Sequence, residues 1–322
     1  MTVYRQRLPQ LRHELFLTDG GLETTLIFHE GVALPSFAAF DLLKDEAGTA
    51  VLRRYFERYA AIARAQGTGL VLETPTWRAN PDWAAKLGYD ALALADANRR
   101  SVGLLLEVRN AFGGGTLVIS GNLGPRGDGY QAAGRMSAAE AEAYHAPQIR
   151  VFAETDADMV AAFTMTYAEE AIGIVRAAKT AGMPVAISFT TETDGRLPSG
   201  EALDQAIART DEATGGAPAY YMVNCAHPTH LAGALERGGG WRDRVRGLRA
   251  NASRRSHAEL DESPDLDAGD PDELARQYDE LRAAFPRLSV AGGCCGTDHR
   301  HIAAIGRALG RPAGAGAQAA LT

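Results

Sequence analysis

The sequence has only three cysteines in 322 residues and lacks the long charged or apolar runs that mark several classes of protein. So few cysteines do not form the disulfide framework of a secreted domain. The formal net charge of −7 and the absence of a run rich in lysine or arginine argue against nucleic-acid binding. No stretch of about 18 apolar residues is present, and residues 1–10 do not resemble a signal peptide. We therefore expect a cytoplasmic protein that binds neither nucleic acids nor membranes.

A dinucleotide-binding turn is also missing, because no Gly-x-Gly-x-x-Gly segment follows the first apolar run. Instead, eight strand-like apolar runs alternate with helical patterns, which is typical of βα units and a parallel sheet. Ser137 with Glu140, and Thr166 with Glu169, have the spacing of capping boxes at two of the helices. The expected strands cover residues 15–19, 70–74, 117–122, 159–163, 185–190, 220–225, 245–251 and 288–292. The expected helices cover residues 51–66, 91–112, 138–154, 167–181, 203–213, 229–236, 273–285 and 299–309.

Eight such units predict an α/β fold, a closed (β/α)8 TIM-type barrel, in preference to an open doubly wound sheet. The connections from a helix into the next strand are mostly short and rich in small residues, whereas those that leave a strand are long. Barrel enzymes build their active sites from the latter, at the carboxyl ends of the strands. We expect one barrel domain over residues 1–322, with a flexible tail at 311–322. Its long loops cover residues 20–50, 76–90, 123–136 and 252–272.

All three cysteines lie where an expected strand ends. Cys225 follows the run 219–224, and Cys294 and Cys295 follow the run 288–293. Alternate strands of a barrel contribute side chains to the same interior layer, so these thiols can converge above the barrel mouth. Three protein ligands with a fourth position open are typical of catalytic zinc, whereas structural zinc is usually closed by four. Packing of buried thiols, or a disulfide between the two neighbouring cysteines, are the alternatives.

A short acidic turn, Asp19-Gly20-Gly21, follows the first expected strand, which is next to the eighth strand in a closed ring. This turn, residues 74–76, Asn224-Cys225 and Gly292-Gly293-Cys294-Cys295-Gly296 resemble the homocysteine S-methyltransferase family in their order and rough spacing. The resemblance covers nearly the whole chain, and the double-cysteine motif is its most specific part. It implies a (β/α)8 fold with zinc bound by Cys225, Cys294 and Cys295.

The resemblance also assigns residues to the acceptor substrate. It implies that Asp19 contacts the amino group of a thiol amino acid. Many family members carry a second carboxylate, a glutamate near the end of strand four, where this chain has Phe163. Glu23, Glu73 or Glu192 could replace it, although each could equally be a solvated loop acid. The expected substrate-binding set is completed by Gly20, Thr74 and Asn224, the last of which would also support the zinc-ligand loop.

The reaction that the resemblance implies is methyl transfer to sulfur, with no protein general acid or base. A free thiol with a pKa of about 8.5 is only a few per cent ionised at pH 7, and zinc removes that limitation. We expect a small onium donor, S-methylmethionine or S-adenosylmethionine, whose methyl group Trp77, Tyr130 and Phe163 could contact. The acceptor is homocysteine or a related small thiol or selenol, and a corrinoid protein is a less favoured partner. A metal-free barrel lyase or oxidoreductase, and a non-catalytic zinc-binding barrel, remain as alternatives.

Overall fold

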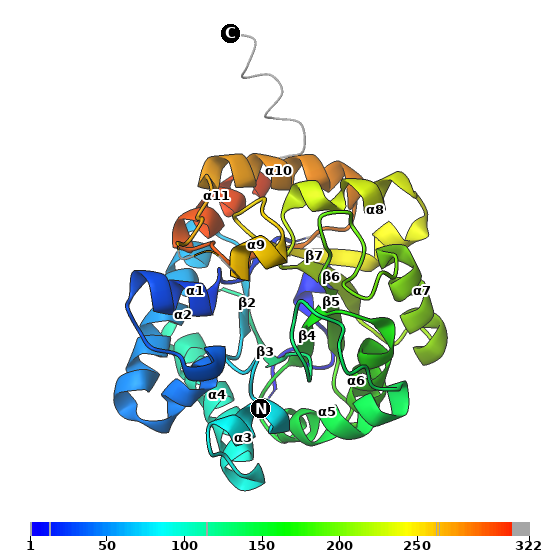
Figure 1. Ribbon diagram of the computed structural model, residues 1–322. Coiled ribbons are helices and arrows are strands. Elements are labelled where there is room, and N and C mark those ends of the chain that lie inside the picture. The colour runs from blue at the N-terminus through cyan, green and yellow to red at the C-terminus, as the bar shows by residue number, and fades with distance from the viewer. Residues whose placement is uncertain (1, 13, 114, 262, 264, 311–322) are drawn as a thin grey trace.

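The computed structural model describes residues 2–310, apart from residues 13, 114, 262 and 264, so the expected tail at 311–322 lies outside the described residues. Eight parallel strands close into a barrel in the order β1 to β8, with β1 paired to both β2 and β8 (Figure 1). The predicted (β/α)8 barrel is confirmed. The strands are β1 (Phe16–Leu17), β2 (Gly69–Glu73), β3 (Leu117–Leu123), β4 (Met159–Met165), β5 (Val185–Phe189), β6 (Tyr220–Asn224), β7 (Val245–Ala250) and β8 (Val290–Gly293).

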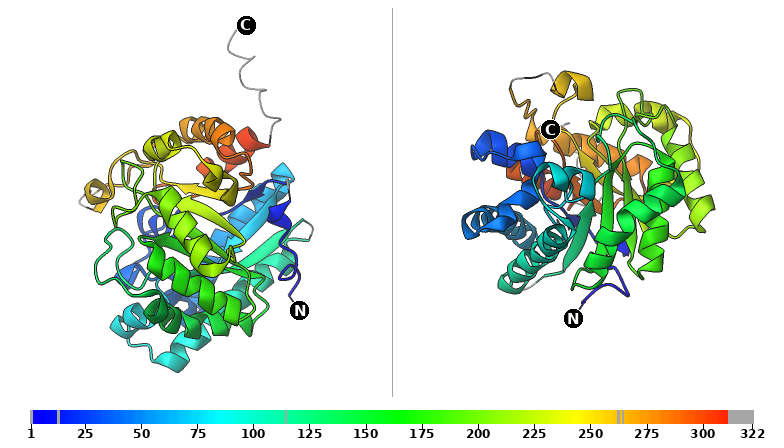
Figure 2. Two further views of the ribbon diagram at one scale, coloured as in Figure 1. Left: turned by 90° about the vertical axis from the view of Figure 1, so that its right-hand side faces the viewer. Right: turned by 60° about the horizontal axis from the view of Figure 1, so that its bottom comes forward.

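Helices surround the strands and form the outer layer of the molecule (Figure 1 and Figure 2). They are α1 (Leu22–Thr24), α2 (Glu46–Gln66), α3 (Pro81–Lys86), α4 (Ala91–Ala111), α5 (Ala138–Ala153), α6 (Ala168–Thr180), α7 (Leu203–Thr214), α8 (Ala232–Glu236), α9 (His257–Asp261), α10 (Pro271–Ala284) and α11 (His299–Leu309). Short 3₁₀ or π turns cover Pro9–Leu11, Thr25–His29, Pro35–Phe37, Ala39–Lys44, Pro228–Leu231 and Gly240–Arg244.

Local capping sets where several of these helices begin. Ser137 and Glu140 form the predicted capping box at the start of α5. The box expected from Thr166 and Glu169 is wrong, because α6 begins one residue later than expected. Tyr167 therefore occupies its N-cap position, and no side chain caps that helix.

The apolar core has one part inside the barrel and another between the strands and the surrounding helices. Strands β3 to β8 are buried along nearly their whole length, as expected of a parallel sheet covered on both faces. The interior part includes Val71, Val118, Ala161, Met222 and Val290. These side chains fill the barrel interior, so a ligand would have to bind at the mouth of the barrel.

Glycines bring the chain segments after β1 and β8 into contact. A Cβ atom on Gly21 would lie only 2.6 Å from the carbonyl oxygen of Cys294. The backbone N–H of Gly293 donates a hydrogen bond to the carbonyl of Asp19, with an N···O distance of 2.9 Å. This close approach places the acidic turn beside the double cysteine.

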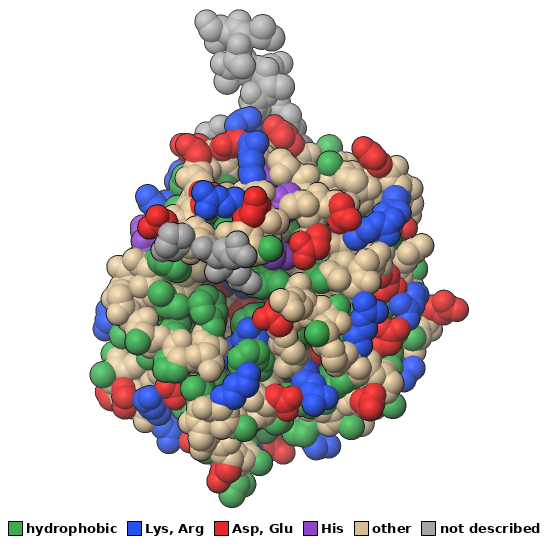
Figure 3. Space-filling view, viewed as in Figure 1, with side chains coloured by type: hydrophobic (Ala, Val, Ile, Leu, Met, Phe, Trp, Pro, Cys, Tyr) green, Lys and Arg blue, Asp and Glu red, His purple; other side chains and the backbone are tan. Residues whose placement is uncertain are grey.

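The long segments that follow the strands cover the carboxyl-terminal face of the barrel. Figure 3 shows this face, with hydrophobic side chains gathered toward its centre and charged side chains spread around them. Among the described residues, no helix combines the length and the apolar character that crossing a membrane requires.

Candidate active site

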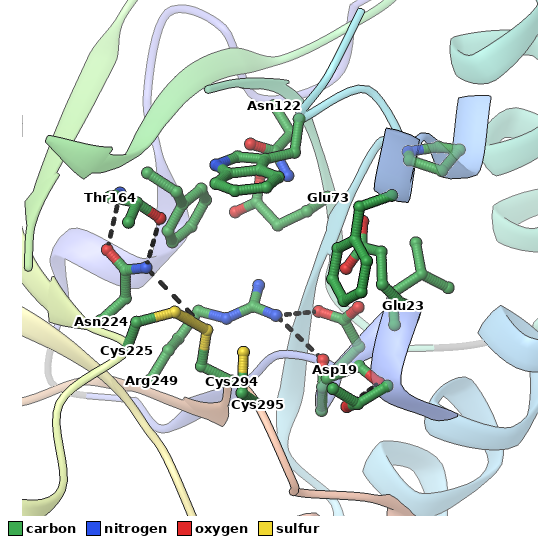
Figure 4. Close-up of a pocket in the computed structure, with 18 of the residues that line it drawn as sticks. Asp19, Glu23, Glu73, Asn122, Thr164, Asn224, Cys225, Arg249, Cys294 and Cys295 are labelled. Carbon is green, nitrogen blue, oxygen red and sulfur yellow. Dashed lines mark hydrogen bonds and ion pairs between the residues drawn. A yellow bond between two sulfur atoms is a disulfide. The ribbon is translucent and has the colours of Figure 1, made fainter. Parts of the chain in front are cut away.

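The three cysteines converge at the mouth of the barrel (Figure 4). Cys225 follows β6 whereas Cys294 and Cys295 follow β8, and the three Sγ atoms all lie within 4.8 Å of one another. Cys225 and Cys294 are joined by a disulfide. A disulfide was expected, if at all, between the two neighbouring cysteines, so the observed pairing corrects that alternative. Side chains of adjacent residues diverge, whereas residues at the ends of alternate strands meet across the mouth.

Asn224, the last residue of β6, holds the backbone on which Cys225 lies. Its Oδ1 accepts hydrogen bonds from the Thr164 backbone N–H (2.9 Å) and from the Ser188 hydroxyl (2.7 Å). Its Nδ2 donates to the Thr164 Oγ1 at 2.9 Å. Thr164 and Cys225 have φ angles of 62° and 53°, a left-handed conformation that is uncommon for residues with a Cβ atom. Surrounding contacts must enforce such backbone conformations, and residues held in them cluster at functional sites.

Tyr130, on the loop after β3, covers the sulfur cluster. Its hydroxyl oxygen lies 3.4 Å from the Sγ of Cys295 and 3.9 Å from that of Cys225. Its ring packs against His257, with 4.3 Å between the ring centroids. His257 in turn contacts the carbonyl of Cys225 and lies 3.2 Å from a carboxylate oxygen of Glu192. Glu192 therefore belongs to the outer support of the cluster.

Arg249 on β7 is a candidate that the sequence analysis missed. Its buried guanidinium group forms an ion pair with Asp19 at 2.7 Å and donates hydrogen bonds to the carbonyls of Gly20 (3.2 Å) and Gly293 (3.0 Å). The Tyr55 hydroxyl donates to the other carboxylate oxygen of Asp19 at 3.0 Å. Burial raises the pKa of Asp19, while the positive charge of Arg249 and the bond from Tyr55 act in the opposite direction. An arginine within an apolar strand was the signal that could have revealed it.

Two further carboxyl groups face the same space. Burial raises the pKa of Glu73 to about 8 and that of Glu23 to about 7. Both groups therefore favour the protonated form more than an ordinary carboxyl group does. The Thr74 hydroxyl lies 2.6 Å from that of Thr76 and accepts a hydrogen bond from the Asn122 backbone N–H, so it braces the end of β2.

These residues surround an inner cavity of about 80 Å³. The guanidinium carbon of Arg249 lies 5.0 Å from the centroid of the Phe163 ring on its wall. Glu192 is not part of the lining. The expected site residues that do line it are Asp19, Gly20, Glu23, Glu73, Thr74, Phe163, Asn224, Cys225, Cys294 and Cys295.

An outer cavity of about 440 Å³ adjoins the inner one. Acidic side chains outnumber arginine in its lining, which contains Asp128, Asp265 and Asp267 but a single arginine, Arg78. The Arg78 guanidinium carbon lies 4.1 Å from the centroid of the Trp77 ring, so it covers one face of that ring. The residues that line both cavities are Thr24, Phe37, Trp77, Tyr130 and Cys295.

Comparison with known proteins identifies the family of this chain. The family model described as homocysteine S-methyltransferase matches residues 16–309. The chain belongs to the homocysteine S-methyltransferase family. It is therefore a methyltransferase, and the family resemblance drawn from the sequence motifs is confirmed. A comparison with curated protein sequences finds no match.

Solved structures of the homocysteine methyltransferase MmuM from Escherichia coli are similar to this family member in fold. The metallated form has a TM-score of 0.73 at 19% sequence identity, over 94% of this chain and 98% of that one. The oxidized form has a TM-score of 0.73 at 20% identity, over 92% of this chain and 97% of that one. At such low identity the similarity establishes the barrel fold, while the family match establishes the enzyme class.

Proposed function

We propose that this member of the family transfers a methyl group from a small onium donor to the thiol of homocysteine, or of a related small thiol or selenol, at a zinc ion. The supporting observation is that the three sulfur atoms converge where the two cavities meet. Cys295 lines both cavities, and Cys225 and Cys294 line the inner one. An acceptor in the inner cavity and a donor in the outer one would therefore approach each other at the sulfur cluster.

The residues present fit a zinc ion. Tetrahedral zinc with Zn–S distances of about 2.3 Å holds its sulfur ligands about 3.8 Å apart. Three Sγ atoms lie within 4.8 Å of one another, so separation of Cys225 and Cys294 on reduction of their disulfide would bring the set to about that spacing. Thiolates are the binding form, so the disulfide between Cys225 and Cys294 must be reduced before zinc binds. Bound there, zinc would lower the pKa of a substrate thiol so that it reacts as the thiolate at neutral pH.

The need for reduced cysteines also bears on where the enzyme works. Thiols persist in the reducing cytoplasm, whereas oxidising compartments favour disulfides. We therefore propose the cytoplasm as its location.

The outer cavity suits a cationic donor. Its excess of acidic side chains attracts positive charge, and Tyr130 offers an aromatic side chain beside the sulfur cluster. With a volume of about 440 Å³ it leaves more room than the inner cavity for a donor such as S-methylmethionine or S-adenosylmethionine. A corrinoid protein that presents a methyl group at the mouth is the less favoured partner.

A donor and acceptor screen tests this function. Reduced, zinc-loaded enzyme is incubated with S-methylmethionine, S-adenosylmethionine or methylcobalamin, each combined with homocysteine, cysteine or selenocysteine, and methylated products are identified by mass. We expect methionine from homocysteine, about one zinc per chain, and loss of both zinc and turnover in Cys294→Ala. Gly103→Ala, in helix α4 and away from the site, is the matched control.

Two outcomes would favour the alternatives. Unchanged turnover of cysteine variants without zinc would indicate a metal-free lyase or oxidoreductase. Stable zinc binding with no turnover of any donor and acceptor pair would indicate a non-catalytic zinc-binding barrel.

A further inference from the structure

The inner cavity carries an arrangement of polar groups for the head group of the acceptor that differs from the one the family resemblance implies. This inference rests on the proposed function and deepens it. We infer that Glu73 and Asn122 bind the ammonium group of the acceptor amino acid and that Arg249 binds its carboxylate.

Neither of the two positions that the resemblance assigns to the amino group offers an unpaired carboxylate in this chain. At the first position, near the end of β4, the apolar ring of Phe163 lies against the guanidinium group of Arg249. The second, Asp19, already forms an ion pair with Arg249 at 2.7 Å and accepts a hydrogen bond from Tyr55. Because its charge is compensated within the protein, Asp19 attracts a ligand ammonium group only weakly.

Two unpartnered oxygen atoms lie on the opposite wall of the same cavity. Glu73 ends β2 and Asn122 lies on the neighbouring strand β3, and both line the cavity (Figure 4). Among the described residues, Glu73 Oε2 and Asn122 Oδ1 are buried without a hydrogen-bond partner. Buried polar atoms are rarely left in this state, and each one calls for an explanation. An ammonium group has three hydrogen-bond donors and no acceptor, so it complements two such oxygens.

The electrostatics of Glu73 agree with a cationic ligand. Only 3% of its surface is exposed, and this burial is the main reason for its raised pKa. The charge of Arg249 and the neighbouring Ser120 hydroxyl oppose the increase without cancelling it. A ligand ammonium group beside Glu73 would supply the missing positive charge and favour the carboxylate form.

Arg249 is placed to bind the other end of an amino acid head group. Its Nε and one terminal nitrogen hold it to backbone carbonyls and to Asp19. Figure 4 shows the guanidinium group extending into the cavity between the sulfur cluster and Glu73. A guanidinium group with a planar set of five donors can serve Asp19 and a ligand carboxylate at once.

The other two glutamates are weaker candidates for the ammonium group. Glu23 lines the cavity, but its carboxylate accepts a hydrogen bond from its own backbone and is not among the buried atoms without a partner. Glu192 lies outside the lining and contacts His257.

Calorimetric binding of three thiols to reduced, zinc-loaded enzyme tests the inference. The thiols are L-homocysteine, 4-mercaptobutanoate, which lacks the amino group, and 3-mercaptopropan-1-amine, which lacks the carboxylate. Glu73→Gln should weaken binding of homocysteine and of the amine by about tenfold to a hundredfold, and that of 4-mercaptobutanoate by less than about threefold. Arg249→Met should weaken binding of homocysteine and of 4-mercaptobutanoate more than that of the amine. Glu212→Gln, at an exposed position on α7 that lines neither cavity, is the matched control and should change none of the three.

The pattern across the thiols separates recognition from structural damage. An equal loss for all three thiols in Glu73→Gln, or no loss for any, would overturn the inference. If Arg249→Met does not fold, Glu73→Gln decides the question alone. The selective pattern without turnover in the donor screen would reject the proposed function and leave the head-group assignment standing. Turnover without the pattern would reject only the assignment, and failure of all three thiols to bind would reject both.

Discussion

The buried carboxyl group of Glu73 gives the folded protein a pH dependence of stability that a single substitution should remove. Burial raises the pKa of Glu73 from its ordinary value of 4.5 to about 8. Between these two values the folded chain holds a proton that the unfolded chain has lost, so the free energy of unfolding falls as pH rises through this window. The side-chain amide in the variant Glu73→Gln cannot ionise, so that variant carries no such penalty at this site.

The magnitude follows from the difference between the two pKa values. The full interval corresponds to about 5 kcal/mol, at 1.36 kcal/mol for each pH unit between them. Part of it has already developed at pH 6, and it is complete only above pH 8. Between pH 6 and pH 9, metal-free wild type should therefore lose about 2 to 3 kcal/mol of stability relative to Glu73→Gln.

Urea unfolding of both proteins at a series of pH values measures this difference. The experiment uses reduced, metal-free enzyme, so that zinc adds no charge near the site. Glu23 and the other titrating groups are common to both proteins, and their contributions cancel in the comparison. Two stability curves that stay parallel from pH 6 to pH 9 would show that Glu73 is not a buried, proton-holding group, and the reasoning would be refuted.

Three other changes have defined outcomes. Gly21→Ala should destabilise the fold by more than about 2 kcal/mol in urea unfolding, because its Cβ would lie 2.6 Å from the Cys294 carbonyl oxygen. The control is Gly103→Ala in α4, where an added Cβ meets no atom within 4 Å, and it should stabilise the fold by about 0.5 to 1 kcal/mol. Equal effects would contradict the close approach. Asn224→Ala should cost about 1 to 3 kcal/mol, since the Thr164 backbone N–H loses its acceptor, and should weaken zinc binding by about tenfold or more in a competition titration; unchanged zinc affinity would argue against its supporting role. Oxidised enzyme should take up little zinc and recover about one zinc per chain after reduction, because the disulfide occupies two of the three ligands; equal uptake in both states would exclude the sulfur cluster as the zinc site.

Local sequence patterns were sufficient to locate the elements that carry the site. The apolar run predicted as a strand at 220–225 forms β6 (Tyr220–Asn224), and the run at 288–292 forms most of β8 (Val290–Gly293). Boundaries differ from the expected ones where a cap decides them. The helix expected at 51–66 begins at Glu46, because the Asp45 side chain accepts a hydrogen bond from the Gly48 backbone N–H and caps an earlier first turn.

The motifs predicted the sulfur cluster but not the polar network around it. The sequence could predict that Cys225, Cys294 and Cys295 lie close together, because the carboxyl ends of the strands share one face of a barrel. Nothing in the local sequence distinguishes Glu73, which lines the cavity, from Glu192, which does not. Both follow or end an apolar run, and only the position of each strand in the ring and the direction of each side chain separate them.

The sequence by itself determined the alternation of strands and helices, the barrel class and the residues able to bind zinc, because these depend on periodicity and on side-chain chemistry. The tertiary structure decided that Arg249 neutralises Asp19 and that Glu73 lies buried in the cavity. Such pairings depend on ring closure, which brings together residues far apart in the chain. The charge of a carboxyl group depends on its burial and its neighbours, and these exist only after the barrel has formed.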